Sequence, residues 1–163
     1  MQTVRTIEAP AAPKGSRFAV VVSKFNDSVT ERLENGAIRA LTAGGVESAA
    51  ITVVRVPGAF EIPIAARHAA LTGRFGAVVC LGCVIKGETP HFEYIAAAVA
   101  HGITDAAAAT GVPMAFGVLT TNSLEEAIER AGEGTSNKGW EAAVAAMEMV
   151  AVVAALARDA AGR

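Results

Sequence analysis

The chain has 163 residues, of which 52% are apolar and 18% are charged, and its formal net charge at pH 7 is −2. This length suits one domain around a single core, and the absence of a lysine or arginine cluster argues against nucleic acid as a partner. The longest apolar stretch, residues 142–157, carries Glu148 in its middle, so we expect no membrane span. No secretory signal is recognisable, and we expect a soluble, cytoplasmic protein.

The chain starts with an arm and continues as strands that alternate with helices. Residues 1–16 show no hydrophobic period, so we expect a flexible arm there and a single domain over residues 17–163. In chain order, the predicted elements are a strand at 17–23, a helix at 28–43, a strand at 50–56, a helix at 61–72, a strand at 76–81, a helix at 90–110, a strand at 114–119, a short helix at 123–131 and a long helix at 140–159.

Capping residues set several of these boundaries. Capping boxes at residues 28–31 and 123–126 predict the starts of the first and fourth helices. Thr89 is expected to cap the third helix, with Pro90 at its first position. The glycine pair at residues 44–45 ends the first helix.

The alternation of strands and helices implies a four-stranded parallel sheet with right-handed crossovers and helices on both faces. In such sheets, ligands bind at the carboxyl ends of the strands. The unusual residues of this sequence fall in the loops at those ends, at residues 25–26, 57–61, 83–91 and 120–122. These loops are therefore the predicted site.

The loop at residues 87–89 is suited to an anion. It presents free backbone N–H groups and the positive end of a helix, a combination that binds phosphate. His91 follows one turn into that helix, and histidine is the side chain best suited to exchange protons near neutral pH. The alternative is an ordinary surface histidine at a helix start.

Several other residues have both a functional and a structural interpretation. Phe25 lies in a turn, where an aromatic ring either covers the core or forms a platform for a planar ligand. Glu61 either favours a helix N-terminus by its charge or accepts hydrogen bonds from ring N–H groups. Arg130 and Lys138 flank a glycine-rich loop, and such charges are by default solvated.

Cys80 and Cys83 form a lone C-x-x-C pair across the predicted end of a strand. A redox pair of this kind normally opens a helix, and a zinc site would need further cysteines or histidines that the sequence lacks. We expect Cys80 in the core, Cys83 in a loop wall, and no metal.

Taken together, these residues resemble the 6,7-dimethyl-8-ribityllumazine synthase family. The resemblance runs from Arg17 to the C-terminal helix. It is carried by Lys24-Phe25-Asn26, by Val-Pro-Gly-Ala-Phe-Glu-Ile-Pro at 56–63, by Gly87-x-Thr89-Pro90-His91, by Phe-Gly-Val-Leu-Thr-Thr-Asn at 116–122, by Ala-Ile-Glu-Arg-Ala-Gly at 127–132 and by Asn137-Lys138-Gly139.

The resemblance implies a transferase of riboflavin biosynthesis with a flavodoxin-like, three-layer αβα sandwich. Such enzymes condense 5-amino-6-(D-ribitylamino)uracil with 3,4-dihydroxy-2-butanone 4-phosphate, releasing phosphate and water, and they use no metal and no organic cofactor. Imine formation, phosphate elimination and ring closure each move protons, so one histidine can serve several steps.

The resemblance also implies a role for each matching position. His91 is the proton donor and acceptor. The pyrimidine and its ribityl chain contact Phe25, Ala59, Phe60, Glu61, Cys83, Val84, Ile85 and Phe116. The phosphate substrate contacts Gly87, Glu88, Thr89 and Arg130, with residue 88 acting through its backbone. Asn26 and Lys138 are auxiliary.

The family forms homopentamers, and some members build decamers or sixty-subunit icosahedral shells. Phe116 and Arg130 are implied to reach the site from the adjacent subunit, and riboflavin synthase is a further implied partner. The alanine-rich helices supply surface for such contacts.

Two alternatives stay open at this point. The first is a non-catalytic paralogue that binds lumazine or flavin, which would need neither His91 nor Arg130. The second is a phosphosugar aldolase or isomerase, for which Lys86 is the nearest candidate for an imine-forming lysine.

Overall fold

The four apolar runs form one parallel sheet with the strand order β2-β1-β3-β4. The computed structural model describes residues 3–8 and 11–162. Its elements are β1 (Phe18–Ser23), α1 (Asp27–Ala43), η1 (Ser48–Ala50), β2 (Ile51–Val56), η2 (Ala59–Glu61), α2 (Ile62–Leu71), β3 (Ala77–Ile85), α3 (His91–Thr110), β4 (Met114–Thr121), α4 (Leu124–Arg130) and α5 (Lys138–Ala161).

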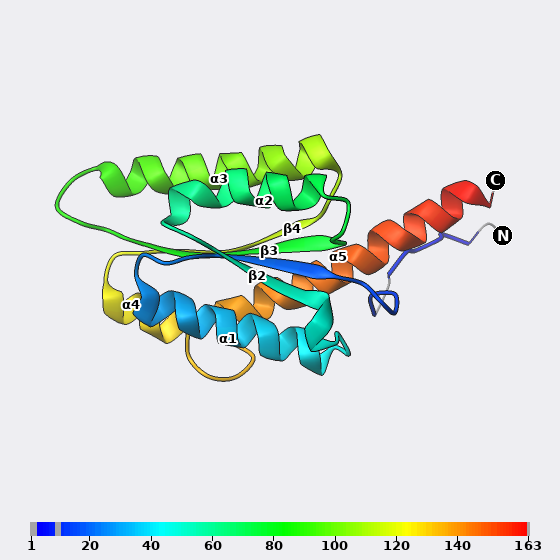
Figure 1. Ribbon diagram of the computed structural model, residues 1–163, viewed down its shortest axis with the longest axis horizontal. Helices are drawn as coiled ribbons and strands as arrows, with labels where there is room; N and C mark the ends of the chain where they lie inside the picture. Colours follow the sequence, from blue (N-terminus) through cyan, green and yellow to red (C-terminus); the bar gives the residue numbers. More distant parts are fainter. Residues whose placement is uncertain (1–2, 9–10, 163) are drawn as a thin grey trace.

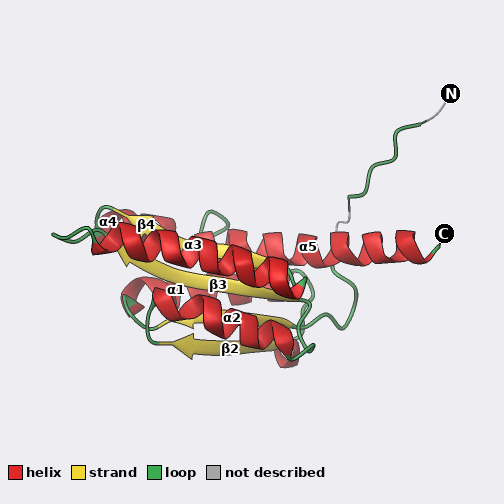
Figure 2. Cartoon of the chain, turned by 90° about the horizontal axis from the view of Figure 1, so that it is seen from above, coloured by secondary structure: helices red, strands yellow, loops and turns green. Residues whose placement is uncertain are grey.

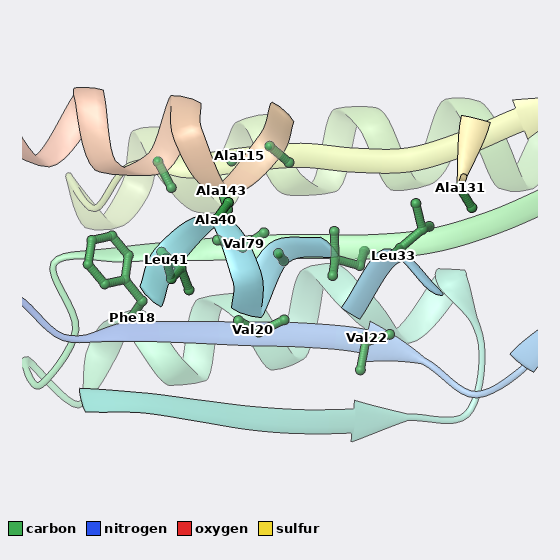
Figure 3. Close-up of a cluster of buried hydrophobic side chains, with 14 of the residues drawn as sticks. Phe18, Val20, Val22, Leu33, Ala40, Leu41, Val79, Ala115, Ala131 and Ala143 are labelled. Carbon is green, nitrogen blue, oxygen red and sulfur yellow. The ribbon is translucent and has the colours of Figure 1, made fainter. Parts of the chain in front are cut away.

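Helices cover both faces of the sheet, with α2 and α3 on one face and α1, α4 and α5 on the other (Figure 1). The predicted three-layer αβα sandwich of the flavodoxin-like class is therefore confirmed. Every residue of β1 is buried, as expected for a central strand of a parallel sheet. Phe18 and Val20 point toward α1 and α5 (Figure 3), whereas Val21 points toward α2 and α3.

The last helix, α5, is long and apolar. Its 24 residues extend over about 36 Å, and by length and composition alone it could cross a membrane. Its first half packs on the sheet and on α1, while its second half extends past the sheet (Figure 2). Ala143 and Ala146 are buried in that first half, so this part behaves as a core helix of a globular domain.

The predicted arm is described in part, because residues 1–2 and 9–10 lie outside the described residues. Residues 3–8 and 11–16 contain neither helix nor strand. Arg5 forms an ion pair with Asp159 on the projecting end of α5.

Two predicted helix starts are wrong. The helix α1 begins at Asp27 rather than at a Ser28 cap, because the Asn26 carbonyl already accepts from Val29 and Thr30 N–H groups at 3.0 Å each. The helix α3 begins at His91 with Pro90 as its N-cap, and no side chain caps it.

Among the remaining helices, the start of α4 confirms the predicted cap, whereas the start of α5 was predicted two residues late. The Ser123 hydroxyl accepts from the Glu126 N–H at 3.2 Å, as predicted for α4. The helix α5 begins two residues earlier than expected, because the Asn137 side chain caps it by accepting from Gly139 and Trp140 N–H groups. A buried asparagine thus sets a boundary that the sequence pattern placed at the tryptophan.

The strands β3 and β4 are longer than predicted. They stay paired up to Ile85 and Thr121, four and two residues beyond the expected ends. Cys83 therefore lies inside a strand, and its prediction as a loop wall is wrong. The physical reason is the pairing with β4, whose backbone provides hydrogen-bond partners for β3 at residues where the apolar pattern alone had suggested a loop.

Candidate functional site

A crevice opens at the carboxyl end of the sheet between β1 and β3. The two strands are paired only up to Val22 and Leu81, after which β3 continues to Ile85 with β4 alone as its partner. The chain leaves β1 toward β2 on one side and leaves β3 toward β4 on the other. This reversal of direction is the topological switch point at which open parallel sheets bind ligands.

The crevice holds a cavity of about 270 Å³, which is at the lower end of small-molecule pockets. Its lining comes from the ends of β1, β2 and β3 and from the start of α3. The lining residues are Phe25, Asn26, Gly58, Ala59, Phe60, Cys83, Val84, Ile85, Gly87, Thr89, His91, Phe92 and Ile95.

Asn26 spans the mouth of the crevice. Its Nδ2 donates to the Cys83 carbonyl at 2.9 Å, replacing the strand partner that β3 loses beyond β1. Asn26 is also the one non-glycine residue with positive φ (64°) in the described part of the chain. Asparagine tolerates this left-handed conformation better than most residues.

The backbone around Phe25 is fixed while its ring is free. The Phe25 N–H donates to the Pro57 carbonyl at 3.1 Å and the Lys24 N–H to the Val56 carbonyl at 2.8 Å, so the turn stays tied to the end of β2. The Phe25 side chain is nevertheless 71% exposed. A fixed backbone with an exposed ring at the pocket edge fits a platform rather than a lid on the core.

The backbone of β3 also faces the crevice. Successive residues of a strand direct their N–H and C=O groups to opposite sides. The Lys86 N–H bonds to Thr121 on β4, whereas the Cys83 carbonyl bonds to Asn26 on the β1 side. By this alternation the N–H and C=O of Ile85 point into the crevice, where no strand pairs with them.

The loop before α3 leaves polar groups open to solvent. Residues 86–90 are exposed, and the loop extends beyond the carboxyl ends of the strands (Figure 1). His91, the first residue of α3, is exposed and makes no side-chain hydrogen bond or ion pair within the described residues. It is therefore free to contact a ligand in the cavity that it lines.

Two predicted residues lie beside this pocket without lining it. Glu61 ends η2, and its Oε1 lies 3.3 Å from the point where a Cβ on Gly58, a residue of the pocket wall, would stand. Glu88 is exposed in the loop between Gly87 and Thr89, both of which line the pocket.

The other three predicted residues are not brought to this pocket. Phe116 pairs with Cys80 in the middle of β4 and is 47% exposed, about 10 Å along the strand from the level of Cys83. Arg130 and Lys138 belong to the helical layer of α1, α4 and α5. Their charged groups bond to the Glu126 carbonyl and the Glu141 carboxylate.

Two lining residues, Phe92 and Ile95, were missing from the predicted site, and they face the pocket from α3. Gly58 lies within the predicted loop at residues 57–61, where no role was assigned to it, and it forms part of the wall. Phe92, Ile95 and the buried Val99 follow one another at helical spacing. That apolar stripe was the available signal that these side chains face inward.

Both cysteines are free and buried in β3. Burial raises the pKa of Cys80 to about 12 and that of Cys83 to about 11. Both thiols are therefore neutral at pH 7, which does not favour a role as nucleophile. No cluster of three or more potential metal ligands occurs among the described residues.

Comparison with known proteins connects this geometry to a family. The model of the 6,7-dimethyl-8-ribityllumazine synthase family matches residues 15–154. A relative of that name from Syntrophus aciditrophicus (strain SB) is 57% identical over 137 residues, covering 84% of this chain and 89% of the relative. Another, from Chlorobium luteolum (strain DSM 273 / BCRC 81028 / 2530), is 49% identical over 147 residues, covering 90% and 95%.

Proposed function

Because the chain belongs to the 6,7-dimethyl-8-ribityllumazine synthase family, we propose that the crevice between β1 and β3 is its active site. The protein is a transferase of riboflavin biosynthesis that condenses 5-amino-6-(D-ribitylamino)uracil with 3,4-dihydroxy-2-butanone 4-phosphate. The observation that carries the assignment of the site is the cavity at the switch point, which collects residues from the ends of three strands.

The pyrimidine stacks on Phe25 and forms hydrogen bonds with the backbone at the end of β3. A planar ring gains most from an aromatic face, and the exposed Phe25 ring provides one at the pocket edge. Ring N–H and carbonyl groups pair with the open backbone groups of Ile85. The Glu61 carboxylate, beside Gly58 of the pocket wall, accepts hydrogen bonds from the ribityl hydroxyls.

The phosphate of the second substrate lies against the loop at Gly87 and Thr89. In support, the N–H groups of residues 87–89 donate to no backbone carbonyl among the described residues, and α3 adds the positive end of its dipole. His91 lines the same cavity as Gly87 and Thr89 of this loop and Phe25 of the pyrimidine pocket. It takes and returns the protons of imine formation, phosphate elimination and ring closure.

Holding the two substrates in register supplies much of the rate. Positioning two reactants side by side contributes several kcal/mol, roughly 7 to 11 in favourable cases. The cavity places the Phe25 ring and His91 on one continuous wall. A protein that only bound lumazine would have no use for the anion loop beside the histidine.

A second copy of the chain completes the site. Phe116, Arg130 and Lys138 lie outside the pocket of their own chain, so they act in the pocket of a neighbour. An arginine fork from the neighbour supplies the charge that the loop at Gly87 lacks for a phosphate. A cyclic assembly such as a pentamer, with each site between adjacent copies, meets this requirement for every copy.

The direct test is to mix the purified protein with both substrates and to follow lumazine absorbance and fluorescence against the uncatalysed reaction. Faster formation is expected, and it should be lost in His91→Ala. An intact oligomer that binds lumazine without accelerating its formation would contradict the proposed catalysis.

The shared site is tested by mixing subunits. His91→Ala and Arg130→Ala are each assembled alone and then together, by co-expression. If Arg130 acts in a neighbour's pocket, mixed oligomers contain some sites with both wild-type residues, and activity returns. If both residues act within one chain, every site carries one defect and mixing restores nothing.

A further inference from the structure

The helices α1 and α5 approach each other so closely that two glycines are required. A Cβ on Gly139 would lie 2.0 Å from the Leu33 carbonyl oxygen. A Cβ on Gly36 would lie 2.2 Å from Oδ1 of Asn137. Neither separation is tolerable, so the backbone of α1 is in direct contact with the start of α5.

Asn137 is enclosed at this contact and uses all of its hydrogen-bonding capacity. It is 1% exposed. Its Nδ2 donates to the carbonyls of Arg32 on α1 and Gly132 in the loop, at 3.2 and 2.8 Å. Its Oδ1 accepts from Gly139 and Trp140 at 2.8 and 3.1 Å. An amide has two donors and two acceptor positions, so all four are used within the chain.

The segment that Asn137 holds is the one between Arg130 and Lys138. Arg130 is the last residue of α4, Lys138 is the first of α5, and residues 133–136 between them are exposed. The segment is anchored at its start by the buried Ala131, whose N–H continues the α4 bonding. Further along, the Gly132 carbonyl accepts from the Asn137 side chain, and the Gly134 carbonyl accepts from the Asn137 backbone N–H at 3.4 Å.

We propose that Asn137 is a positioning residue for the phosphate-binding Arg130 and for the nearby Lys138. By joining the loop to α1, its side chain sets where Arg130 and Lys138 stand on the surface offered to a neighbouring copy. The inference rests on the proposed function, in which Arg130 meets the phosphate of the second substrate and Lys138 is an auxiliary charge nearby. Releasing the bridge leaves both charges present but displaced, and a displacement of about 1 Å can cost up to roughly 100-fold.

The variant Asn137→Ser separates the bridge from the helix cap. Serine is a good N-cap and can still accept from the α5 N–H groups, but it cannot donate to both Arg32 and Gly132. The expected result is a Michaelis constant for the butanone phosphate raised by about 10- to 100-fold, with the constant for the pyrimidine within about twofold. Amide hydrogen exchange of residues 132–136 should accelerate while Trp140 stays protected.

A second variant reaches the same side chain from α1. Gly36→Ala displaces the Asn137 amide without touching either cation, and it should reproduce the selective loss for the phosphate substrate. The double variant Gly36→Ala/Asn137→Ser should be no worse than Asn137→Ser alone, because the bridge is already broken. Leu41→Ala, also on α1 and buried in the same core, is the control for a general loss of stability and should leave both Michaelis constants unchanged.

Arg130→Ala separates a failure of this proposal from a failure of the proposed function. If Arg130→Ala weakens the phosphate substrate while Asn137→Ser and Gly36→Ala do not, the positioning role is refuted and the phosphate site stands. If Arg130→Ala has no effect on that substrate, the phosphate role of Arg130 and the positioning role of Asn137 are both overturned.

Discussion

Removing the Phe25 ring should damage substrate binding without damaging the fold. The side chain is 71% exposed, so little of it contributes to the core. Substitutions at such positions change the free energy of unfolding by about 0.5 kcal/mol or less. Stacking of a base-like ring on an aromatic side chain is worth about 1–3 kcal/mol, which corresponds to a factor of about 5 to 150 in affinity.

The assay measures the Michaelis constants of the Phe25→Ala variant for both substrates and the midpoint of its unfolding in urea. The constant for the pyrimidine should rise by that factor, while the constant for the butanone phosphate and the unfolding midpoint stay near wild type. Phe18→Ala is the matched control, because Phe18 is 0% exposed and its truncation should cost about 3–5 kcal/mol of stability. If Phe25→Ala lowered stability and left pyrimidine binding unchanged, Phe25 would be a lid on the core and the platform would be refuted.

Three further predictions follow from the site and from β3. His91→Ala should lower kcat by about 10²- to 10⁴-fold while the oligomer seen by size-exclusion chromatography is unchanged; wild-type turnover would remove His91 from the mechanism. Asn26→Ala should be less stable to urea than Asn26→Gly by about 1 kcal/mol, because only glycine accepts φ of 64° without strain; equal midpoints would contradict that conformation. Burial raises the pKa of Cys80 from its ordinary value of 9.0 to about 12, so the folded state binds more protons than the unfolded state above pH 9. The free energy of unfolding should therefore be retained below pH 9 and fall by about 1.4 kcal/mol per pH unit per thiol above it. For Cys80→Ala the free energy of unfolding should fall less steeply with pH. Parallel curves for the variant and the wild type would refute the raised pKa of Cys80.

The layer architecture could be predicted from sequence because its signals are local. The β-branched run at Phe18 and the glycines after α1 identify an element without any knowledge of its neighbours. The length of β3 could not be predicted in this way, since Gly82 reads as the start of a loop. In the fold Gly82 is a strand residue, and a Cβ there would lie 2.9 Å from Cδ1 of Ile62. The need for this glycine comes from a helix far away in the sequence.

The site was predictable to the extent that it follows from topology. The strand-end rule identifies Phe25, Ala59 and His91, which the fold brings to one cavity. It says nothing about which face of α3 turns inward, so Phe92 and Ile95 were missed. The capping errors concern two boundaries. Asn26 was read as part of a turn, whereas it is the N-cap of α1 and its side chain is held by the distant Cys83 carbonyl. Pro90 was read as the first helical residue, whereas it is the N-cap of α3.

The four residues of β3 that run past β1 have a consequence for how this protein tolerates change. The proposed recognition by the N–H and C=O of Ile85 depends on where the strand lies and not on which side chain it carries. A substitution at Val84 or Ile85 would reshape the apolar wall, yet the donor and acceptor pattern offered to the substrate ring would persist. In the proposed site, the hydrogen-bonding part of specificity for the ring therefore depends on the course of the main chain, and the side chains of Val84 and Ile85 can vary as long as β3 stays paired with β4.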